Sequence, residues 1–337
     1  MMEKKKNINE IMDFVRRKKN AIALVLIAIL STCNVASWIY QQRKTDNYKS
    51  ADEYEFLNPA TTLVDKHDSI INFQSLRDSL DEKYGTRDDL LVSLYFEYLP
   101  TGANISVNKD EEIWPASLIK IPVAMAAMKK VQSGKWKLSN ELVILDEDKD
   151  SDFGMMYQLP TGTTMTIEEL LKKSLIDSDN TAHFVLLRNL DGGEIEDVYV
   201  HLGLDDIIDA IKKTPQGAEV DNRMTAKRYS IFFRSLYNAT FLDAQHSQLF
   251  MDILKNAPKE YLSAGVPENI KFVHKTGIRV DDNVRADAGI VYVTGRPYLL
   301  TVMIQKKNHS PIEEGESENI FESISKEIYE YVSQAQQ

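Results

Sequence analysis

Three short patterns in this chain combine residue types that could together carry out serine acyl transfer. The first supplies a serine hydroxyl with an amine three residues later, the second a further hydroxyl that could relay a proton, and the third an anion-binding strand edge. Each pattern alone would be weak evidence for such a site. Together they supply what this chemistry requires: a nucleophile with its base, a proton relay and an anion site. In chain order they are Ser117-Leu-Ile-Lys120, Ser178-Asp179-Asn180 and Lys275-Thr276-Gly277.

The serine and lysine spacing of the first pattern arises easily by chance. Ser106 and Ser323 also have a lysine three residues later, at Lys109 and Lys326. Only Ser117 opens an apolar run with helical character, and only it is followed by the two other patterns, each of which occurs once. The sequence therefore favours Ser117 as the nucleophile.

Ser117 and Lys120 are expected to start a helix on which both side chains point to the same side. Unpaired N–H groups at a helix N-terminus favour a developing oxyanion and help to keep a nearby amine neutral, so Lys120 could act as the base. The structural alternative is that Ser117 only caps the helix and Lys120 is solvated. Pro122 fits a first helical position, so the helix either bends there or begins later than Ser117.

The elements around these patterns group into strands and helices in a definite order. They are a helix at 63–85, strands at 91–98 and 105–107, helices without convincing strands from 117 to about 258, strands at 270–274, 288–294 and 298–305, and a final helix with an apolar stripe at Ile320, Ile324, Ile328 and Val332. This grouping predicts an α+β protein whose antiparallel sheet is built from both ends of the chain, with a helical insertion.

The sequence resembles the penicillin-recognising serine enzymes, and within them the class A β-lactamase-like branch. The resemblance covers roughly residues 63–335 and implies a five-stranded antiparallel sheet flanked by helices, an all-helical lobe at about 117–258, and a site in the cleft between them. The stretches that carry it are Pro115-Ala-Ser-Leu-Ile-Lys, Met165-Thr-Ile-Glu-Glu-Leu-Leu, Ser178-Asp-Asn-Thr-Ala and His274-Lys-Thr-Gly.

The resemblance implies roles for the second pattern. Ser178 would relay a proton to the leaving nitrogen, and Asn180 would contact both the substrate amide and Lys120. Asp179 would face inward and fix the loop. The structural alternative is that Ser178 or Asp179 simply caps the helix that follows.

The resemblance also implies roles for the third pattern. Lys275 and Thr276 would bind the carboxylate of a β-lactam or of an acyl-D-alanine peptide, and Gly277 would let the substrate lie close to the strand. The oxyanion hole would be the backbone N–H groups of Ser117 and Ile278. Arg279 and Arg285 are weaker candidates for further carboxylate contacts, since a surface arginine is more often solvated.

No cofactor or metal is expected. The run Asp146-x-Asp148-x-Asp150 has the spacing of a calcium loop, but Ser151 stands where glycine is required. It is predicted to be a solvated acidic turn. The six histidines have no metal-ligand spacing.

One part of the class A pattern is missing. Efficient enzymes of that branch have a loop glutamate, followed by leucine and asparagine, that activates the deacylating water. The corresponding stretch here, about 203–225, contains no Glu-x-x-Leu-Asn, and its single glutamate is Glu219. The chain is therefore expected to form an acyl-enzyme and to hydrolyse it slowly, whether as a weak β-lactamase or as a D,D-carboxypeptidase. An inactive wall-binding or scaffolding protein is the remaining alternative.

The N-terminal region predicts a membrane anchor. Residues 21–40 carry no charge, and residues 1–20 hold seven basic against three acidic side chains. The positive-inside rule then places 1–20 in the cytoplasm, 21–40 across the membrane, 41–62 as a linker and 63–337 outside. A cleaved signal peptide and a lipoprotein site at Cys33 are the alternatives.

The composition excludes some kinds of site and argues against one kind of partner. Cys33 is the single cysteine, so no internal disulfide and no thiolate metal site can form. Residues 51–337 hold 30 basic and 47 acidic side chains, which argues against nucleic acid as a partner.

Overall fold

The computed structural model describes residues 34, 55–58, 71–214, 220–307, 312–313 and 315–334. The chain divides into two units, Met1–Glu53 and Tyr54–Gln337, and all of these residues except Asn34 belong to the second. The predicted cytoplasmic tail and, apart from Asn34, the predicted transmembrane segment lie outside the described residues. None of the helices that are described is long and apolar enough to cross a membrane.

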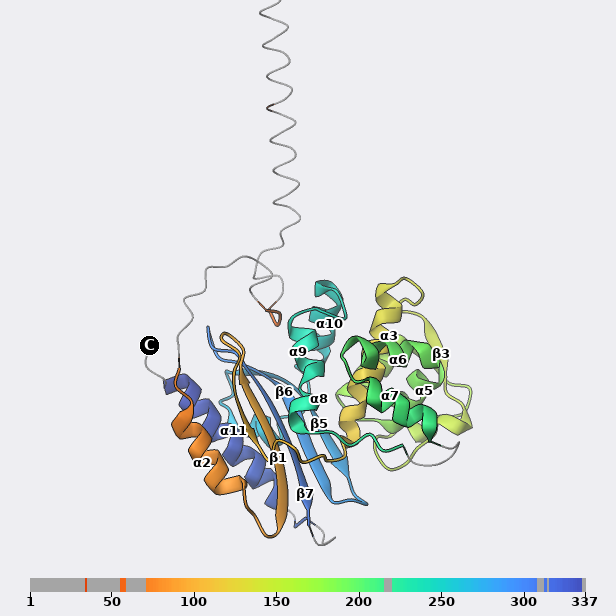
Figure 1. Ribbon diagram of the computed structural model, residues 1–337. Coiled ribbons are helices and arrows are strands. Elements are labelled where there is room, and N and C mark those ends of the chain that lie inside the picture. The colour runs from red at the N-terminus through yellow and green to blue at the C-terminus, as the bar shows by residue number, and fades with distance from the viewer. Residues whose placement is uncertain are drawn as a thin grey trace, which may run out of the picture. The chain divides into compact units, whose positions relative to one another are not determined.

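Five antiparallel strands form one sheet in the spatial order β2-β1-β7-β6-β5 (Figure 1). β1 pairs with β7, with Leu94 opposite Val302, so the sheet joins strands that are far apart in the sequence. The strands are β1 (Leu90–Tyr98), β2 (Ala103–Val107), β5 (Lys271–Arg279), β6 (Val284–Tyr292) and β7 (Tyr298–Lys306). The predicted α+β class with a five-stranded antiparallel sheet is confirmed.

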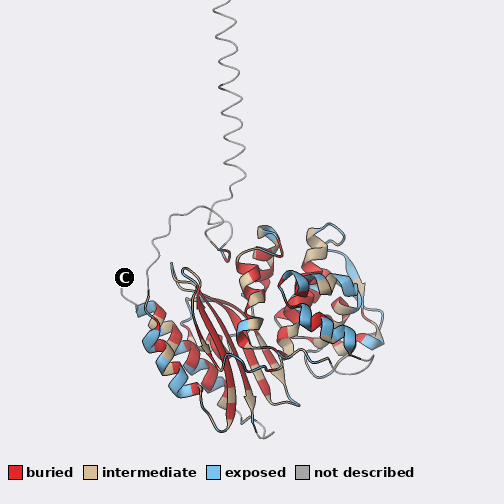
Figure 2. Cartoon of the chain, viewed as in Figure 1, coloured by how far each residue is buried: buried red, intermediate tan, exposed pale blue. Residues whose placement is uncertain are grey.

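The two faces of β1 are buried in two different cores. Val92, Leu94 and Phe96 pack with α2 (Gln74–Tyr84) and α11 (Glu316–Gln334), which cover one side of the sheet in Figure 1. Tyr95 lies in the other core. The apolar stripe predicted for the last helix is buried in α11. Alternation along β1 therefore separates two cores rather than core from solvent, and the strands are buried along most of their length (Figure 2).

The second core forms around α3 (Lys120–Gln132), in which residues 120–128 are all buried. Two short strands, β3 (Glu141–Val143) and β4 (Thr164–Thr166), pair in this region, so the expectation of no strands there was wrong. Three residues are too few to give a periodic signal. The other elements are η3 (Ala116–Ile119), η4 (Asp146–Asp148), η5 (Met156–Gln158), α4 (Ile167–Leu175), α5 (Asn180–Arg188), α6 (Gly192–His201), α7 (Asp205–Lys213), α8 (Ala226–Tyr229), α9 (Ile231–Tyr237), α10 (Ala244–Leu254) and η6 (Tyr261–Gly265).

Part of the predicted linker packs against the folded unit. Phe56 is completely buried, and its backbone N–H donates to Gln248 Oε1 at 3.0 Å. Its carbonyl accepts a hydrogen bond from Tyr292 Oη at 2.7 Å. Residues 55–58 therefore belong to the folded unit rather than to a free tether.

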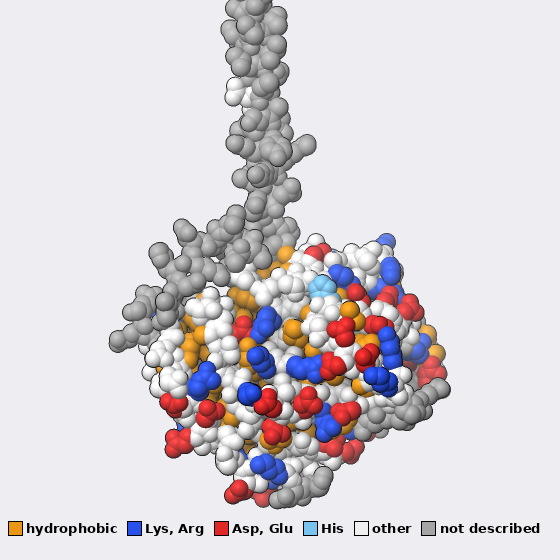
Figure 3. Space-filling view, in the orientation of Figure 1, with side chains coloured by type: hydrophobic (Ala, Val, Ile, Leu, Met, Phe, Trp, Pro, Cys, Tyr) orange, Lys and Arg blue, Asp and Glu red, His pale blue; other side chains and the backbone are white. Residues whose placement is uncertain are grey.

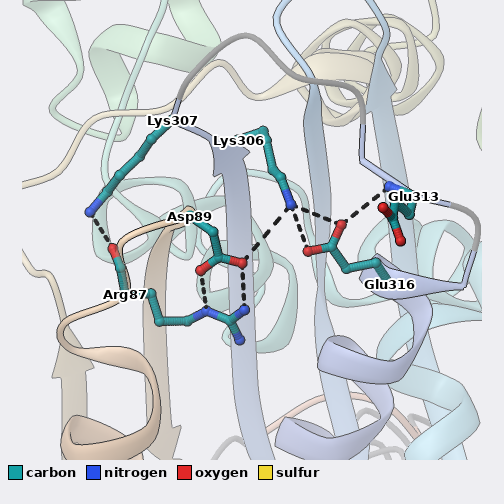
Figure 4. A network of polar contacts seen from close by, with 6 residues as sticks. All are labelled: Arg87, Asp89, Lys306, Lys307, Glu313 and Glu316. Atoms are coloured by element: carbon teal, nitrogen blue, oxygen red, sulfur yellow. Dashed lines mark hydrogen bonds and ion pairs between the residues drawn. The ribbon is translucent and has the colours of Figure 1, made fainter.

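Charged side chains of both signs are intermixed on the face drawn in Figure 3. One network joins the start of β1, the end of β7 and the start of α11 (Figure 4): Arg87 donates to Asp89 at 2.7 Å and Lys306 to Glu316 at 2.7 Å. Partly exposed pairs of this kind contribute ~0–1 kcal/mol each. The two apolar cores must therefore supply most of the stability.

Candidate active site

Ser117 lies in the 3₁₀ turn η3, and Lys120 is the first residue of α3. The α-helix therefore begins later than Ser117, which explains how it accommodates Pro122. Pro122 falls in the first turn of α3, where backbone N–H groups have no intrahelical partner. Ala116, just before the serine, has a positive φ of 51°. The chain thus turns sharply at Ala116 and presents Ser117 at the start of the buried central helix.

The Lys120 amine brings the first two patterns together. Its Nζ lies 3.4 Å from Ser117 Oγ, 3.1 Å from Ser178 Oγ and 2.7 Å from Asn180 Oδ1. It also donates to the carbonyl of Ser178. Because Lys120 is only 2% exposed, the alternative of a solvated lysine does not hold.

Burial sets the protonation of this amine. The pKa of Lys120 is lowered to about 7, first by removal from water and then by the nearby charge of Lys275, while Asp179 and Asp150 act in the opposite direction. A substantial fraction of the amine is therefore neutral near pH 7. A neutral amine beside Ser117 can accept the hydroxyl proton.

Asp179 both caps a helix and fixes the loop beside the site. Its Oδ1 accepts from the N–H of Ala182 at 2.9 Å, which caps α5, and its Oδ2 accepts from Met155 (2.8 Å) and Met156 (2.9 Å). Gly154 is required here: its φ is +91°, and a Cβ would lie 2.0 Å from Asp179 Oδ2. The expected inward position of Asp179 and the capping alternative are thus both observed.

Ser178 occupies a backbone conformation that is unusual for serine, with φ at 54°. The inward Asp179 and the first residues of α5 hold it there. Its Oγ accepts from Lys120 and, at 3.1 Å, from Lys275 Nζ. Ser178 therefore links the lysines of the first and third patterns, which is the geometry that a proton relay needs.

The third pattern lies on β5, the edge strand next to η3. Lys275 is 1% exposed, and burial lowers its pKa to about 8, while the carboxylates of Asp287 and Glu260 oppose this. A Cβ on Gly277 would lie 3.1 Å from the backbone nitrogen of Ser117, tighter than normal packing. Glycine at this position therefore lets the strand approach the nucleophile turn closely.

A cleft of about 680 Å³ opens above Ser117. The predicted site residues Ser117, Lys120, Asn180 and Ile278 line it. Lys275, Thr276 and Gly277 lie on the same edge strand just before Ile278. The other lining residues are Trp114, Ala116, Ile119, Asp152, Phe153, His183, Phe184, Leu187, Asn222, Arg279, Val280 and Asp281.

The two arginines that were weaker candidates already have internal partners. Arg279 forms an ion pair with Asp282, and its guanidinium lies 4.5 Å from the centroid of the Trp114 ring. Arg285 donates to the carbonyl of Val284 at 3.0 Å. Arg279 thus forms part of the cleft wall.

The acidic run at 146–150 is not simply solvated, which corrects the sequence-based interpretation. Asp148 is 1% exposed and accepts two hydrogen bonds from Arg188, at 2.7 and 2.8 Å. Asp150 accepts from Asn180 Nδ2 at 2.8 Å and so orients the amide that faces Lys120. Nothing in the spacing of Asp150 and Asn180 signals this contact.

Among the described residues no group of His, Cys, Asp and Glu could hold a metal.

The sequence also gave no role to His183, which lies one helical turn after Asn180 and lines the cleft. It is 6% exposed, and burial, together with the charge of Lys120, lowers its pKa to about 3. Its Nδ1 has no hydrogen-bond partner in the described part of the protein. The i to i+3 spacing from Asn180 was the one sequence signal for its position.

The first part of the segment where a deacylating glutamate was sought, residues 203–225, forms α7. Glu219 lies outside the described residues. In the part of the chain that is described, the acidic residues lining the cleft are Asp152 and Asp281, neither of which comes from residues 203–225.

A sheet packed on a helical region, with a serine turn leading into a buried helix that starts with lysine, is the arrangement of a serine hydrolase. The chain belongs to the Beta-lactamase enzyme family, whose model matches residues 75–332. It is accordingly a serine hydrolase.

Individual relatives include a β-lactamase and a D-alanyl-D-alanine carboxypeptidase. β-Lactamase VEB-1 of Pseudomonas aeruginosa is 23% identical over 246 residues, which are 67% of this chain and 80% of that protein. D-alanyl-D-alanine carboxypeptidase DacF of Bacillus subtilis is 34% identical over 89 residues, only 26% of this chain and 23% of that protein. The solved structure of PBP-A has a TM-score of 0.67 at 20% identity, covering 77% of this chain and 98% of its own, which shows a shared fold.

Proposed function

We propose that this protein is a membrane-anchored acyl-transfer hydrolase that forms an acyl-enzyme on Ser117 with β-lactams or with D-Ala-D-Ala-type peptides and releases it slowly. The observation that carries the proposal is the buried Lys120 amine, which lies within hydrogen-bond reach of Ser117, Ser178 and Asn180 and has a pKa of about 7.

In the proposed acylation, neutral Lys120 removes the proton of Ser117 as Oγ attacks the substrate carbonyl. The backbone N–H groups of Ser117 and Ile278 stabilise the oxyanion. Ser178, which accepts hydrogen bonds from both lysines, passes its proton to the leaving nitrogen and takes a proton from Lys275, so that Lys120 ends protonated and Lys275 ends neutral. Asn180 holds the substrate amide.

The slow second half is proposed from the sequence, because residues 203–225 contain no Glu-x-x-Leu-Asn that would supply the deacylating base. Loss of general-base help slows a step by ~10²–10⁴-fold. A D,D-carboxypeptidase is the second candidate, favoured by the similarity to DacF and by the same lack of a loop glutamate.

A chromogenic cephalosporin should test the proposal. We expect a burst of about one product per enzyme molecule followed by a slow steady state, because acylation is supported and deacylation is not. Stopped-flow absorbance with an active-site titration measures both phases. Rapid multiple turnover would contradict slow release and make Glu219 the first residue to replace, whereas no burst and no covalent adduct would favour the scaffold alternative.

The two lysine pKa values predict a narrow pH profile. Acylation needs neutral Lys120 and, in the proposed relay, protonated Lys275, so the rate should rise with pH through about 7 and fall above about 8. Since the charge of Lys275 lowers the pKa of Lys120, Lys275→Gln should move the rising limb to higher pH. Second-order acylation rates across pH measure both limbs. A rising limb that stays in place in Lys275→Gln would contradict the coupling.

We infer further that residues 21–40 anchor the enzyme with residues 63–337 outside the cell. The support is the uncharged segment and the seven basic residues before it. Protease added to intact cells should cut the predicted linker before residue 55 and release the folded unit, while a cytoplasmic marker stays intact. Protection of this segment until the cells are lysed would exclude the proposed orientation.

A further inference from the structure

His183 lines the same cleft as Ser117, and the proposed acylation gives it no role. It is 6% exposed, and its Nδ1 is enclosed without a hydrogen-bond partner in the described part of the protein. A neutral imidazole carries one proton, on one of its two ring nitrogens. A proton on Nδ1 would be a buried donor without an acceptor, which is costly, so the proton is expected on Nε2. Nε2 is then the donor that His183 can offer to a molecule bound in the cleft.

The His183 ring offers this hydrogen bond without a charge. Burial lowers the pKa of His183 to about 3, and the charge of Lys120 acts in the same direction. The imidazole is therefore neutral throughout the pH range in which Lys120 changes its protonation. His183 differs in this respect from Lys120 and Lys275, which carry charge in part of that range.

The helix α5 continues from Asn180 as an uncharged wall of the cleft. Its residues that line the cleft are Asn180, His183, Phe184 and Leu187. Phe184 and Leu187 are only partly buried, so part of their apolar surface is open to a bound molecule. An apolar surface with a single neutral donor favours an uncharged acceptor, such as an amide carbonyl, over a charged group.

The spacing along α5 suits a chain that extends beyond the amide held by Asn180. Asn180 Oδ1 accepts from Lys120 and its Nδ2 donates to Asp150, which leaves one N–H of Nδ2 for a substrate carbonyl. His183 follows three residues later, about 4.5 Å along the helix axis. An extended peptide advances ~3.3–3.6 Å per residue. One further peptide unit would therefore bring a second carbonyl to the level of His183.

We propose that His183, Phe184 and Leu187 form a subsite for the acyl side of the substrate, in which His183 Nε2–H donates to a second carbonyl beyond the amide held by Asn180. The class of substrate that fits is a peptidyl group with an additional amide followed by an apolar group. The inference rests on the proposed acylation of Ser117. His183 acts as a positioning residue, because it binds the acyl chain and not the reacting atoms.

Two penicillins test the subsite, one with a phenylacetyl amide and one with a glycine inserted between the phenylacetyl group and the penicillin nucleus. The glycine adds one carbonyl, and intact-protein mass measures the acylation rates. We expect the glycyl probe to acylate Ser117 about tenfold faster, as for one added hydrogen bond. In His183→Leu the ratio of the two rates should fall to about one, because the donor is lost. His183→Gln, which keeps an N–H donor at similar reach, should restore part of the ratio.

His201→Leu is the matched control for the loss of an imidazole. His201 lies at the end of α6, and its Nε2 is 3.0 Å from the carbonyl of Thr240. It is not among the residues that line the cleft in the described structure. Its replacement should leave the ratio of the two acylation rates as in the unchanged protein.

Equal rates with the two probes in the unchanged protein would overturn the inference, and so would a ratio that His183→Leu leaves in place. Acylation by both probes would still support the proposed function. Binding without acylation separates the two failures. In Ser117→Ala, calorimetry with phenylacetyl-D-alanyl-D-alanine and phenylacetylglycyl-D-alanyl-D-alanine should show tighter binding of the glycyl peptide, and addition of His183→Leu should remove that preference. Equal affinities, or no binding of either peptide, would overturn the inference even if neither penicillin acylates the enzyme.

Discussion

Ser117→Ala is expected to abolish covalent labelling of the protein by a fluorescent penicillin. Ser117 is the one serine of the three Ser-x-x-Lys spacings whose hydroxyl contacts its lysine in the described structure, at 3.4 Å, and it lines the cleft. Without the hydroxyl no acyl ester can form at this position. Labelling followed by gel fluorescence and by mass mapping of the modified peptide measures the result.

The chain supplies its own controls for this prediction. Ser106 lies on β2 and Ser323 on α11, both outside the cleft lining. Ser106→Ala and Ser323→Ala should therefore label as the unchanged protein does. An undiminished label on Ser117→Ala would show that another residue is the nucleophile, and mapping of the peptide would identify it.

Lys120→Met is expected to slow the acylation of Ser117 by ~10²–10⁴-fold, the usual contribution of a general base. Methionine is unbranched, apolar and a good helix former, so it suits a side chain that is 2% exposed in the apolar helix α3. The substitution removes the proton acceptor and the donor to Ser178 and Asn180 together. The second-order rate constant for labelling measures the effect.

Lys130→Met is the matched control for Lys120. Lys130 lies on the same helix and pairs with Glu194 at 2.8 Å, away from the cleft lining. Its replacement should alter thermal stability with little effect on acylation. If Lys120→Met labels as fast as the unchanged protein while its melting temperature is also unchanged, another group must remove the serine proton.

The spacing of apolar residues along the chain predicted those elements of the fold whose burial follows a regular period. Alternation identified the strand that becomes β1, because successive side chains face two different cores. Spacing of four residues identified the stripe of α11, because burial of one helix face imposes that period. β3 and β4 were missed because each has only three residues. The position of Pro122 depends on the 3₁₀ turn Ala116–Ile119, because this turn delays the start of the α-helix to Lys120.

The contacts that tune the site were beyond prediction from sequence. Asp150 and Asn180 are thirty residues apart, and no local pattern signals that one orients the other. The same holds for Thr276 and Glu260, which meet only because η6 packs near the edge strand. Long-range polar contacts depend on where whole elements pack, and residue type does not specify that.

The sequence by itself determined which residue types are present, in what order, and hence that this chain has the components of serine acyl transfer without a recognisable loop glutamate. The tertiary structure decided the protonation and the contacts of these residues. Burial lowers the pKa of Lys120 to about 7, because desolvation penalises its charge, and long-range packing brings its amine within hydrogen-bond reach of Ser117, Ser178 and Asn180.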